Sequence, residues 1–449
     1  MSPVHLERTT EWPSEPRSGR GRSHGTSSRE PFDRWFRYPA GFASDYVRLL
    51  LDRLELAKGT VVDCFAGSGV TGTAARARGL GFAGIEAHPL VAELARIKLA
   101  PTASGDQVRA LARDAVEAVR PSIAEGCEGD LAVILRREPD LVRRSFSDET
   151  LSALVLLREA IKGEVDDPAA VYLKWALLGT LRDVAGVKVG WPYQRPAVMR
   201  KPRHSDTLAR FALRAEAMAT DLEMAAAAAA GTSNPAAAQV VVGDSRDPQA
   251  WARLSARGNA CIASPPYLNN FDYADATRLE LYFWGEVTTW GEMCREVRGD
   301  MVTATTQQSS VVEKAASIDD LSRRLGSDCA PVRQILELVD AMTTFRRERE
   351  GRSKEYDQVA PAYFAAMWDI LENLYGNLEA GSTALWLVGD SAPYGVYIDT
   401  PRLIGELAET VGFAYTDDVH LRARGNRWGQ NNDRHKVPLA ERLIVLEKR

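Results

Sequence analysis

The 449-residue sequence predicts an α/β fold in which one open sheet is interrupted by two helical insertions. Three observations support this fold class. A β-branched strand at 60–62 leads through a glycine-rich turn and a helix into a second strand, short buried strands recur at 240–242 and 260–263, and an apolar strand follows at 384–388. Between these blocks, apolar residues recur mostly at helical spacing. The pattern therefore predicts one sheet assembled from three separate parts of the chain.

The composition is that of a soluble globular protein, with 45% apolar and 26% charged residues. No apolar run reaches membrane-spanning length and the N-terminus has no signal-peptide core, so we expect a cytoplasmic protein without a membrane partner. The five cysteines form no Cys-x-x-Cys pair and the six histidines show no ligand spacing, which argues against a disulfide framework and a metal site. Because the net charge is -5, any nucleic-acid surface must be a local basic patch.

The N-terminal stretch 1–34 is polar, with an arginine- and glycine-containing centre at 18–23. We expect it to be disordered or to be an arm that orders on a partner, with a solvated tail as the simpler alternative. Aromatic and apolar residues become frequent from Trp35, and Ser44 stands where the N-cap of a first helix is expected. A folded domain is therefore predicted to begin at Trp35.

The glycine-rich turn after the first strand has the chemistry of a nucleoside site. It contains Gly67 and Gly69, whose lack of a side chain lets a ligand approach the backbone, and the following strand ends in Glu86, whose carboxylate suits the two hydroxyls of a ribose. The spacing is not that of a dinucleotide site, and no lysine stands where a phosphate-binding loop needs one. The pattern favours a ligand with a ribose and no phosphates over a merely structural turn.

A second informative stretch, Ser264-Pro265-Pro266-Tyr267, follows the strand 260–263. In open α/β sheets the carboxyl ends of strands hold ligands. Two prolines stiffen the backbone there and remove two donors, Ser264 offers a hydroxyl, and Tyr267 offers a flat ring. Such a group can hold a planar ring and accept hydrogen bonds from its amino group. Taken alone, a proline-stiffened turn is the simpler interpretation.

The blocks between the predicted strands read as helical insertions, at 105–238 and 286–355, within a catalytic domain made of 35–104, 239–285 and 356–449. The centre of the first insertion interleaves aromatic and basic residues that could stack on bases and contact phosphates. A surface connection anchored by its own aromatics is an equal alternative. The mixed charges of the second insertion favour a solvated helical face. The candidate nucleic-acid contacts are Trp191, Tyr193, Arg195, Arg200, Lys201 and Arg203.

With both motifs present, the sequence resembles the amino-group DNA methyltransferases, which transfer a methyl group from S-adenosylmethionine to N4 of cytosine or N6 of adenine. The resemblance is strong over 35–100 and 240–285 and extends in pattern over 360–449, and it implies a Rossmann-like class I methyltransferase sheet. Segment 63–69 resembles the cofactor motif, 84–86 the ribose-binding strand end, and 264–267 the catalytic motif. The residues that the resemblance assigns to the cofactor are Tyr38, Pro39, Asp63, Phe65, Gly67, Gly69, Thr71, Glu86 and Asp244.

The resemblance also implies a mechanism and a substrate. Acceptors at Ser264 and on the Pro265 carbonyl would hold the two amine protons and aim the nitrogen lone pair at the methyl group, and Tyr267 would stack on a base rotated out of the duplex. Serine at the first position of the motif is more typical of cytosine-N4 enzymes, so we expect a site-specific DNA methyltransferase of that kind. The alternatives are adenine N6, a base amine in RNA, and a catalytically silent nucleic-acid-binding subunit. Associated restriction or defence proteins are possible partners.

Overall fold

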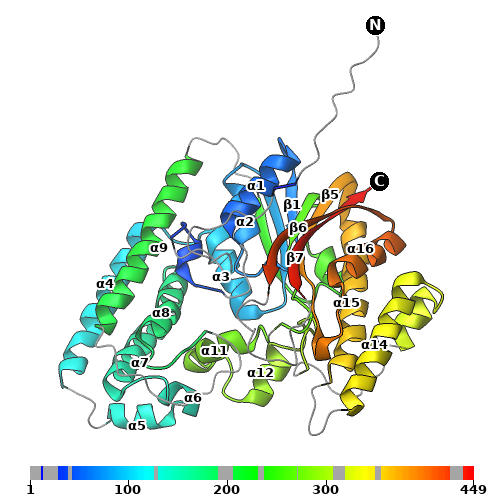
Figure 1. The fold of residues 1–449 in the computed structure, drawn as a ribbon. Coiled ribbons are helices and arrows are strands. Elements are labelled where there is room, and N and C mark those ends of the chain that lie inside the picture. The colour runs from blue at the N-terminus through cyan, green and yellow to red at the C-terminus, as the bar shows by residue number, and fades with distance from the viewer. Residues whose placement is uncertain are drawn as a thin grey trace.

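The computed structural model describes residues 12–13, 29–38, 43–125, 130–190, 206–230, 237–270, 272–306, 319–348, 355–424 and 438–449. Figure 1 shows a twisted central sheet with helices on both faces and a separate bundle of long helices beside it. The three parts of the chain that the sequence assigns to the sheet all supply strands to it. No helix among the described residues has the length and apolar character needed to cross a membrane.

The sheet has seven strands in the order β3-β2-β1-β4-β5-β7-β6. The first five are parallel, and β7 is antiparallel to both of its neighbours. The chain adds β2 and β3 on one side of β1 and then β4 and β5 on the other, so the topological switch point lies between β1 and β4. The predicted Rossmann-like α/β fold is confirmed. The strands are β1 (Thr60–Asp63), β2 (Gly81–Glu86), β3 (Ala238–Val242), β4 (Gly258–Ala263), β5 (Leu378–Gly389), β6 (Phe413–Arg424) and β7 (Leu439–Lys448).

Alternate residues of each central strand pack against different helix layers, as the two-residue period of a strand requires. In β5, Leu385 and Leu387 pack on one face with α1 and α2, whereas Trp386 packs on the other face with α15 and α16. Because both faces are covered, all six residues of β2 are buried. The covering helices are α1 (Ser44–Leu54), α2 (Val70–Arg76), α3 (Pro89–Leu99), α10 (Pro248–Ala252), α15 (Tyr356–Asn377) and α16 (Thr400–Val411).

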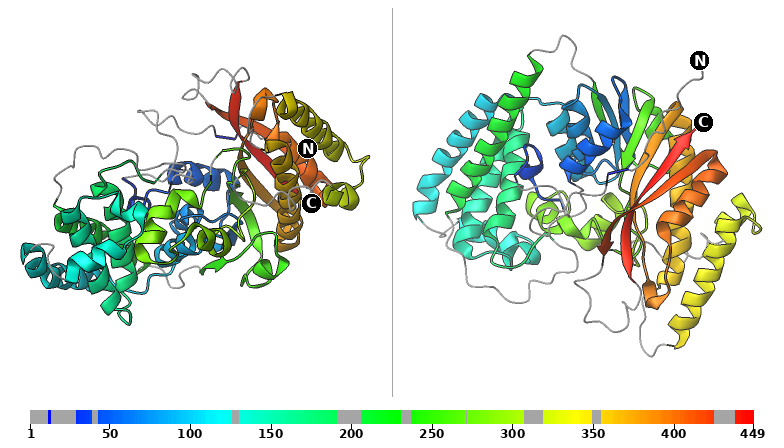
Figure 2. Two further views of the ribbon diagram at one scale, coloured as in Figure 1. Left: turned by 90° about the horizontal axis from the view of Figure 1, so that it is seen from below. Right: turned by 45° about the horizontal axis from the view of Figure 1, so that its top comes forward.

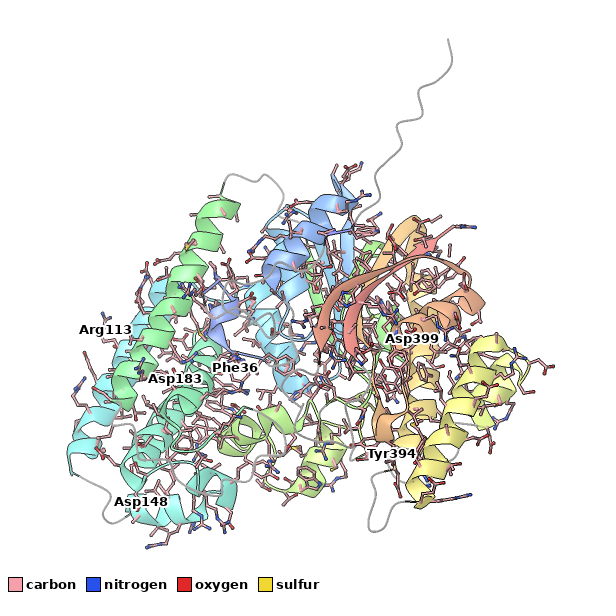
Figure 3. The ribbon with its side chains drawn as sticks, in the orientation of Figure 1. Phe36, Arg113, Asp148, Asp183, Tyr394 and Asp399 are labelled. Atoms are coloured by element: carbon pink, nitrogen blue, oxygen red, sulfur yellow. The ribbon has the colours of Figure 1, made fainter. Side chains whose placement is uncertain are left out.

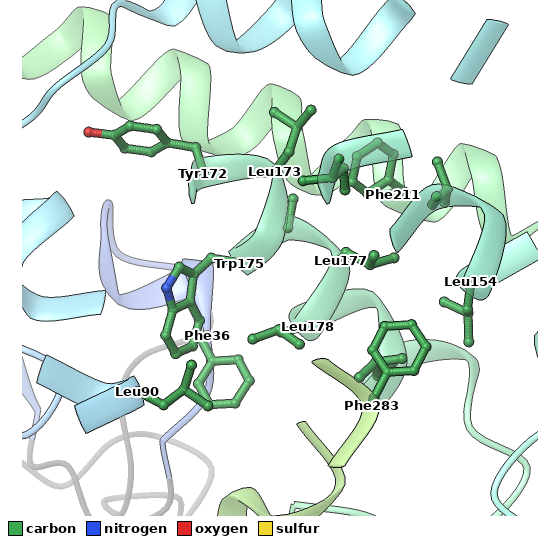
Figure 4. Packing of buried hydrophobic residues seen from close by; sticks show 14 of the residues in the cluster. Phe36, Leu90, Leu154, Tyr172, Leu173, Trp175, Leu177, Leu178, Phe211 and Phe283 are labelled. Atoms are coloured by element: carbon green, nitrogen blue, oxygen red, sulfur yellow. The ribbon is translucent and has the colours of Figure 1, made fainter. Parts of the chain in front are cut away.

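The described residues of the first insertion before β3 form helices and the turns between them, and these helices pack around a hydrophobic core that continues into α3 through Leu90 and Leu94. Figure 4 shows Tyr172, Trp175, Leu177 and Phe211 packed together at its centre. The two views of Figure 2 place this bundle at one end of the sheet, away from α14 (Ala330–Glu348). Its helices are α4 (Gly105–Glu125), α5 (Asp130–Arg137), α6 (Asp140–Arg143), α7 (Asp148–Gly163), α8 (Ala170–Val184) and α9 (Thr207–Ala229).

The segment before the domain also packs on this bundle. Residues 29–34, within the stretch predicted as an arm, differ from that expectation, because a short helix η1 (Asp33–Trp35) docks on α9. The buried carboxylate of Asp221 accepts from the backbone N–H of Phe32 at 2.9 Å and from the indole N–H of Trp35 at 2.8 Å. Phe36, labelled in Figure 3, stacks edge-on against Trp175 with ring centroids 5.1 Å apart. The bundle thus anchors the chain that leads into α1 and the sheet.

The helices of the second predicted insertion, 286–355, pack on two different parts of the structure. Within this insertion, α12 (Trp290–Glu296) buries Met293 in the core of the first insertion, as α11 (Arg278–Trp284), which precedes this region, does with Phe283. In contrast, α14 (Ala330–Glu348) packs along α15 on the far side of the sheet. The region 286–355 therefore contributes helices to both sides of the structure rather than forming one separate unit.

Candidate active site

The glycine-rich loop lies between the end of β1 and the start of α2, beside the switch point of the sheet. Gly67 and Gly69 have φ angles of 51° and 82°, in the left-handed region that favours glycine. A Cβ on Gly69 would also lie only 3.1 Å from the Cβ of Ala95 in α3. Glycine at position 69 is therefore required by the backbone conformation and by the close approach of α3.

Asp63 holds the two ends of this loop together. Its carboxylate, only 1% exposed, accepts from the Phe65 backbone N–H at 2.9 Å and from the Thr71 hydroxyl at 2.7 Å. Burial raises the pKa of this carboxyl to about 7. Beneath the loop, the buried ammonium of Lys98 donates to the Ser68 carbonyl at 2.9 Å, and burial lowers the pKa of Lys98 to about 8. The hydrogen bonds of Asp63 with Phe65 and Thr71 thus stabilise the conformation of the glycine-rich loop.

Glu86 ends β2 with its carboxylate against the loop. One oxygen accepts from the Gly67 backbone N–H at 2.7 Å and the other from the His88 backbone N–H at 2.8 Å. Burial raises the pKa of the Glu86 carboxyl to about 7. Each carboxylate oxygen can accept a second hydrogen bond, so the group retains acceptor capacity for two hydroxyl donors.

Two aromatic side chains predicted for the cofactor site border the same loop. A Cβ placed on Gly67 would lie 3.9 Å from the ring of Tyr38, which is 5% exposed. The ring of Phe65 packs edge-on against Trp386 of β5, with centroids 5.9 Å apart. Pro39, the neighbour of Tyr38 in the prediction, lies outside the described residues.

Asp244 stands in the turn after β3, and its carboxylate pairs with the Arg246 guanidinium at 2.6 Å. The turn is tied to the end of β1, because the Ser245 hydroxyl donates to the Cys64 carbonyl at 2.5 Å. Asn373 of α15 donates to the Ser245 carbonyl at 3.2 Å. The structure thus places the Asp244 turn beside the strand end from which the glycine-rich loop departs.

The Ser264 to Tyr267 segment leaves the end of β4, the strand that pairs with β1. The Ser264 hydroxyl donates to the Leu387 carbonyl of β5 at 3.2 Å. Its single proton is thereby used, and its lone pairs remain as acceptors. Pro265 is buried, and the Tyr267 backbone N–H donates to the Tyr273 hydroxyl at 3.1 Å. Both predicted motifs therefore meet at adjoining strand ends.

The contacts of the Tyr267 side chain come from strands late in the chain. Its hydroxyl donates to the carboxylate of Glu441 in β7, and the guanidinium carbon of Arg424 in β6 lies 4.7 Å from its ring centroid. Neither residue is among the predicted site residues. Arg424 and Glu441 belong to no local motif, so only the pairing of β6 with β7 could have identified them.

A buried histidine connects the two motifs. The Thr277 hydroxyl donates to the Ala274 carbonyl at 3.0 Å, so at the 2.7 Å contact with His88 the imidazole Nε2–H must be the donor. Burial lowers the pKa of His88 to about 4, and the ring is neutral at physiological pH. His88 thus links the strand end that holds Glu86 to the helix after the Ser264 segment. His88 was not among the predicted site residues, but its position two residues after the predicted strand end at Glu86 could have identified it from the sequence.

The six candidate nucleic-acid contacts, from Trp191 to Arg203, lie outside the described residues and stay predictions. Among the described residues, no group of three or more His, Cys, Asp or Glu side chains is arranged to hold a metal ion.

Two comparisons with known proteins agree with this arrangement. A family model of N6/N4 methyltransferases, described as "DNA methylase", matches residues 6–96. The chain is also 23% identical over 469 residues to the Type II methyltransferase M.BsoBI of Geobacillus stearothermophilus, a match that covers 95% of this chain and 87% of that protein. Together with the Rossmann-like sheet and the two motifs at its switch point, these matches make the chain similar to the amino-group DNA methyltransferases.

Proposed function

We propose that this protein transfers a methyl group from S-adenosylmethionine to the exocyclic amine of a DNA base, with N4 of cytosine as the favoured target. The observation that carries the proposal is the placement of the glycine-rich loop and the Ser264 segment on the paired strands β1 and β4. A methyl donor bound at the first and an amine held at the second would meet at the switch point.

The residues around the loop fit the proposed cofactor. Glu86 keeps acceptor capacity toward two ribose hydroxyls, and Gly67 and Gly69 let a ligand approach the backbone. Tyr38 would border the methionine end, and the turn at Asp244 would border the adenine. Phe65 and Pro39, the latter outside the described residues, complete the proposed contacts, and Asp63 and Thr71 would act by holding the loop in shape. When bound, S-adenosylmethionine supplies an electrophilic methyl group on a sulfonium.

The Ser264 segment would bind and orient the base amine. An exocyclic amine is a weak nucleophile because its lone pair is delocalised into the ring. The Ser264 hydroxyl, with its proton committed to Leu387, and the Pro265 carbonyl would each accept one amine proton and turn the lone pair toward the methyl group. Tyr267 would stack on the base, and Pro266 would keep the backbone rigid. Orientation of this kind supplies much of the rate without a general base.

Serine at position 264 supports the choice of cytosine, because the family resemblance associates serine there with N4 enzymes. A neutral hydroxyl can also accept from an adenine amine, so N6-adenine methylation is the second candidate. The intact motifs weigh against a silent binding subunit. Methylation of an RNA amine, association with restriction or defence proteins, and a cytoplasmic location also stay predictions.

We propose the segments 35–104, 239–285 and 356–449 as the catalytic domain and 105–238 as the region that recognises the DNA target. The helices of the first insertion pack mainly on one another, around a core that continues into α3 and α11, and the predicted aromatic and basic residues of the insertion suit DNA. The region 286–355 is a weaker candidate, since its helices pack on two different neighbours.

The test uses labelled S-adenosylmethionine with duplex DNA of varied sequence and with RNA. Digested nucleosides are analysed by mass spectrometry, and N4-methylcytosine is expected. N6-methyladenine would overturn the choice of base, and label in RNA alone would overturn the choice of DNA. Replacement Gly67→Trp, which fills the loop, should abolish cofactor binding in calorimetry. Wild-type protein that binds no cofactor would overturn the enzyme proposal itself.

A further inference from the structure

Tyr267 is held by a carboxylate from the opposite end of the chain. Its hydroxyl donates to Oε1 of Glu441, while Oε2 of the same group pairs with Arg422 Nε at 2.5 Å. Glu441 is only 3% exposed, and a carboxylate so buried needs partners on both oxygens. The phenol of Tyr267 is one of these two partners. The ring is therefore fixed at its outer end as well as at its Cα.

A second contact fixes the ring from its face. The Arg424 guanidinium carbon lies 4.7 Å from the Tyr267 ring centroid, and Arg424 Nη1 donates to the Asp390 carbonyl at 2.8 Å. A Cβ added to Gly389 would lie 2.0 Å from Arg424 Nη1 and 2.8 Å from Tyr267 Cδ2. The bare backbone of Gly389 thus lets both side chains pack against the end of β5. A cation anchored to backbone in this way holds one face of the aromatic ring.

We propose that Glu441 and Arg424 are positioning residues that hold the Tyr267 ring in the one orientation that stacks a base beside Ser264. The inference rests on the proposed function and adds two residues to that same site. A tyrosine side chain turns about two torsions, and a base stacked on a tilted ring would carry its amine away from the Ser264 acceptor. Orientation errors at this scale lower rates by about 10- to 100-fold.

The phenol remains a donor throughout the working range of pH. Burial, and then the negative charge of Glu441, raise the pKa of Tyr267 well above its ordinary value, while Arg424 opposes this effect. Tyr267 therefore stays neutral and keeps its proton on the bond to Glu441. A neutral ring held in this way serves as a stacking platform and not as a proton acceptor.

A purely structural role for Glu441 is the competing explanation. Glu441 lies directly opposite Arg422 in the pairing of β6 with β7, so their ion pair could serve only to hold the two strands together. The two roles differ in one respect. Under the positioning role, the effect of Glu441 on methyl transfer passes through the Tyr267 hydroxyl, whereas under the structural role it does not.

The experiment is a double-mutant cycle on the full-length protein with Tyr267→Phe, Glu441→Gln and the double variant. Tyr267→Phe keeps the ring and removes only the hydroxyl. We expect each single variant to lower kcat about 10- to 100-fold with unchanged affinity for S-adenosylmethionine, and the double variant to be no slower than the slower single one. The matched control is Glu447→Gln, an exposed glutamate on the same strand, which should leave kcat unchanged.

The outcomes distinguish a failure of the proposed function from a failure of the positioning role. If the wild type transfers no methyl group to DNA, the proposed function falls and the positioning role falls with it. If the wild type is active and the two losses multiply in the double variant, or the single variants keep full kcat, the positioning role alone is overturned. Arg424→Ala completes the series, with an expected loss of kcat even in the Tyr267→Phe background, because the guanidinium lies over the ring, which phenylalanine keeps.

Discussion

Replacement of Glu86 by glutamine should show separately how much the buried charge of Glu86 destabilises the fold and how much it contributes to cofactor affinity. The pKa of the Glu86 carboxyl is about 7, against 4.5 for an exposed glutamate. Each pH unit corresponds to about 1.4 kcal/mol, so the ionised carboxylate lowers the free energy of unfolding by about 3 kcal/mol above pH 7. Because the folded pKa is raised, this cost is absent below pH 4.5 and builds up between pH 4.5 and 7.

Glu86→Gln removes the titrating carboxyl group and keeps the size and shape of the side chain. One backbone donor, of Gly67 or His88, then loses its acceptor, at a cost of about 1 to 3 kcal/mol that does not change with pH. Relative to the wild type, the variant should therefore gain about 3 kcal/mol in stability between pH 4.5 and pH 8. Urea unfolding at several pH values measures this difference. A flat difference, or one of opposite sign, would refute the pKa of about 7.

The same carboxyl should make cofactor binding depend on pH. Ribose hydroxyls donate to the ionised form, so below pH 7 each pH unit should strengthen S-adenosylmethionine binding by about tenfold, with a plateau above. Glu86→Gln should bind about 10- to 100-fold more weakly on the plateau, because hydrogen bonds to a charged acceptor are replaced by neutral ones. Calorimetry on both proteins isolates the contribution of Glu86. A variant with the wild-type pH profile would show that the ribose binds elsewhere.

Three further substitutions test other parts of the site. Ser264→Ala should lower single-turnover methyl transfer about 100-fold with unchanged cofactor affinity, and an equal rate would exclude Ser264 as an amine acceptor. Gly389→Ala should lower the melting temperature and kcat through its clash with Arg424, whereas the control Gly376→Ala, in a helix with no atom within 4 Å of the added Cβ, should be neutral or slightly stabilising. Asp221→Ala should cost about 3 kcal/mol in urea unfolding because it leaves the buried Trp35 indole N–H without its acceptor, and wild-type stability would contradict that role.

The central strands and the two motifs were predictable because their signals are local. Val61 and Val62 are β-branched and buried, a glycine-rich turn follows them, and Glu86 ends the next apolar run. A parallel strand that is covered on both faces must be apolar along its length, so its position shows directly in the sequence. The adjacency of the Ser264 segment to the loop then follows from strand order at the switch point.

The late strands were less predictable, since β6 is largely polar and irregular. β6 runs for 12 residues from Phe413 to Arg424, and only Phe413 and Leu421 among them are buried. Its pairing with β7 shifts register twice, and such shifts change which side chains share a face. The contacts of Arg424 and Glu441 with Tyr267 depend on that register and on a sequence separation of 174 residues for Glu441. No local pattern encodes them.

The first insertion is part of the construction of the active site as well as a candidate DNA reader. Arg182 of α8 donates to the Arg37 carbonyl, next to Tyr38, and at 3.1 Å to the Ala276 carbonyl, in the segment that follows Tyr267. The same guanidinium pairs with the fully buried carboxylate of Glu280. One side chain thus joins the segment proposed for the cofactor to the segment proposed for the base. A displacement of α8 would therefore act on both of these segments at once.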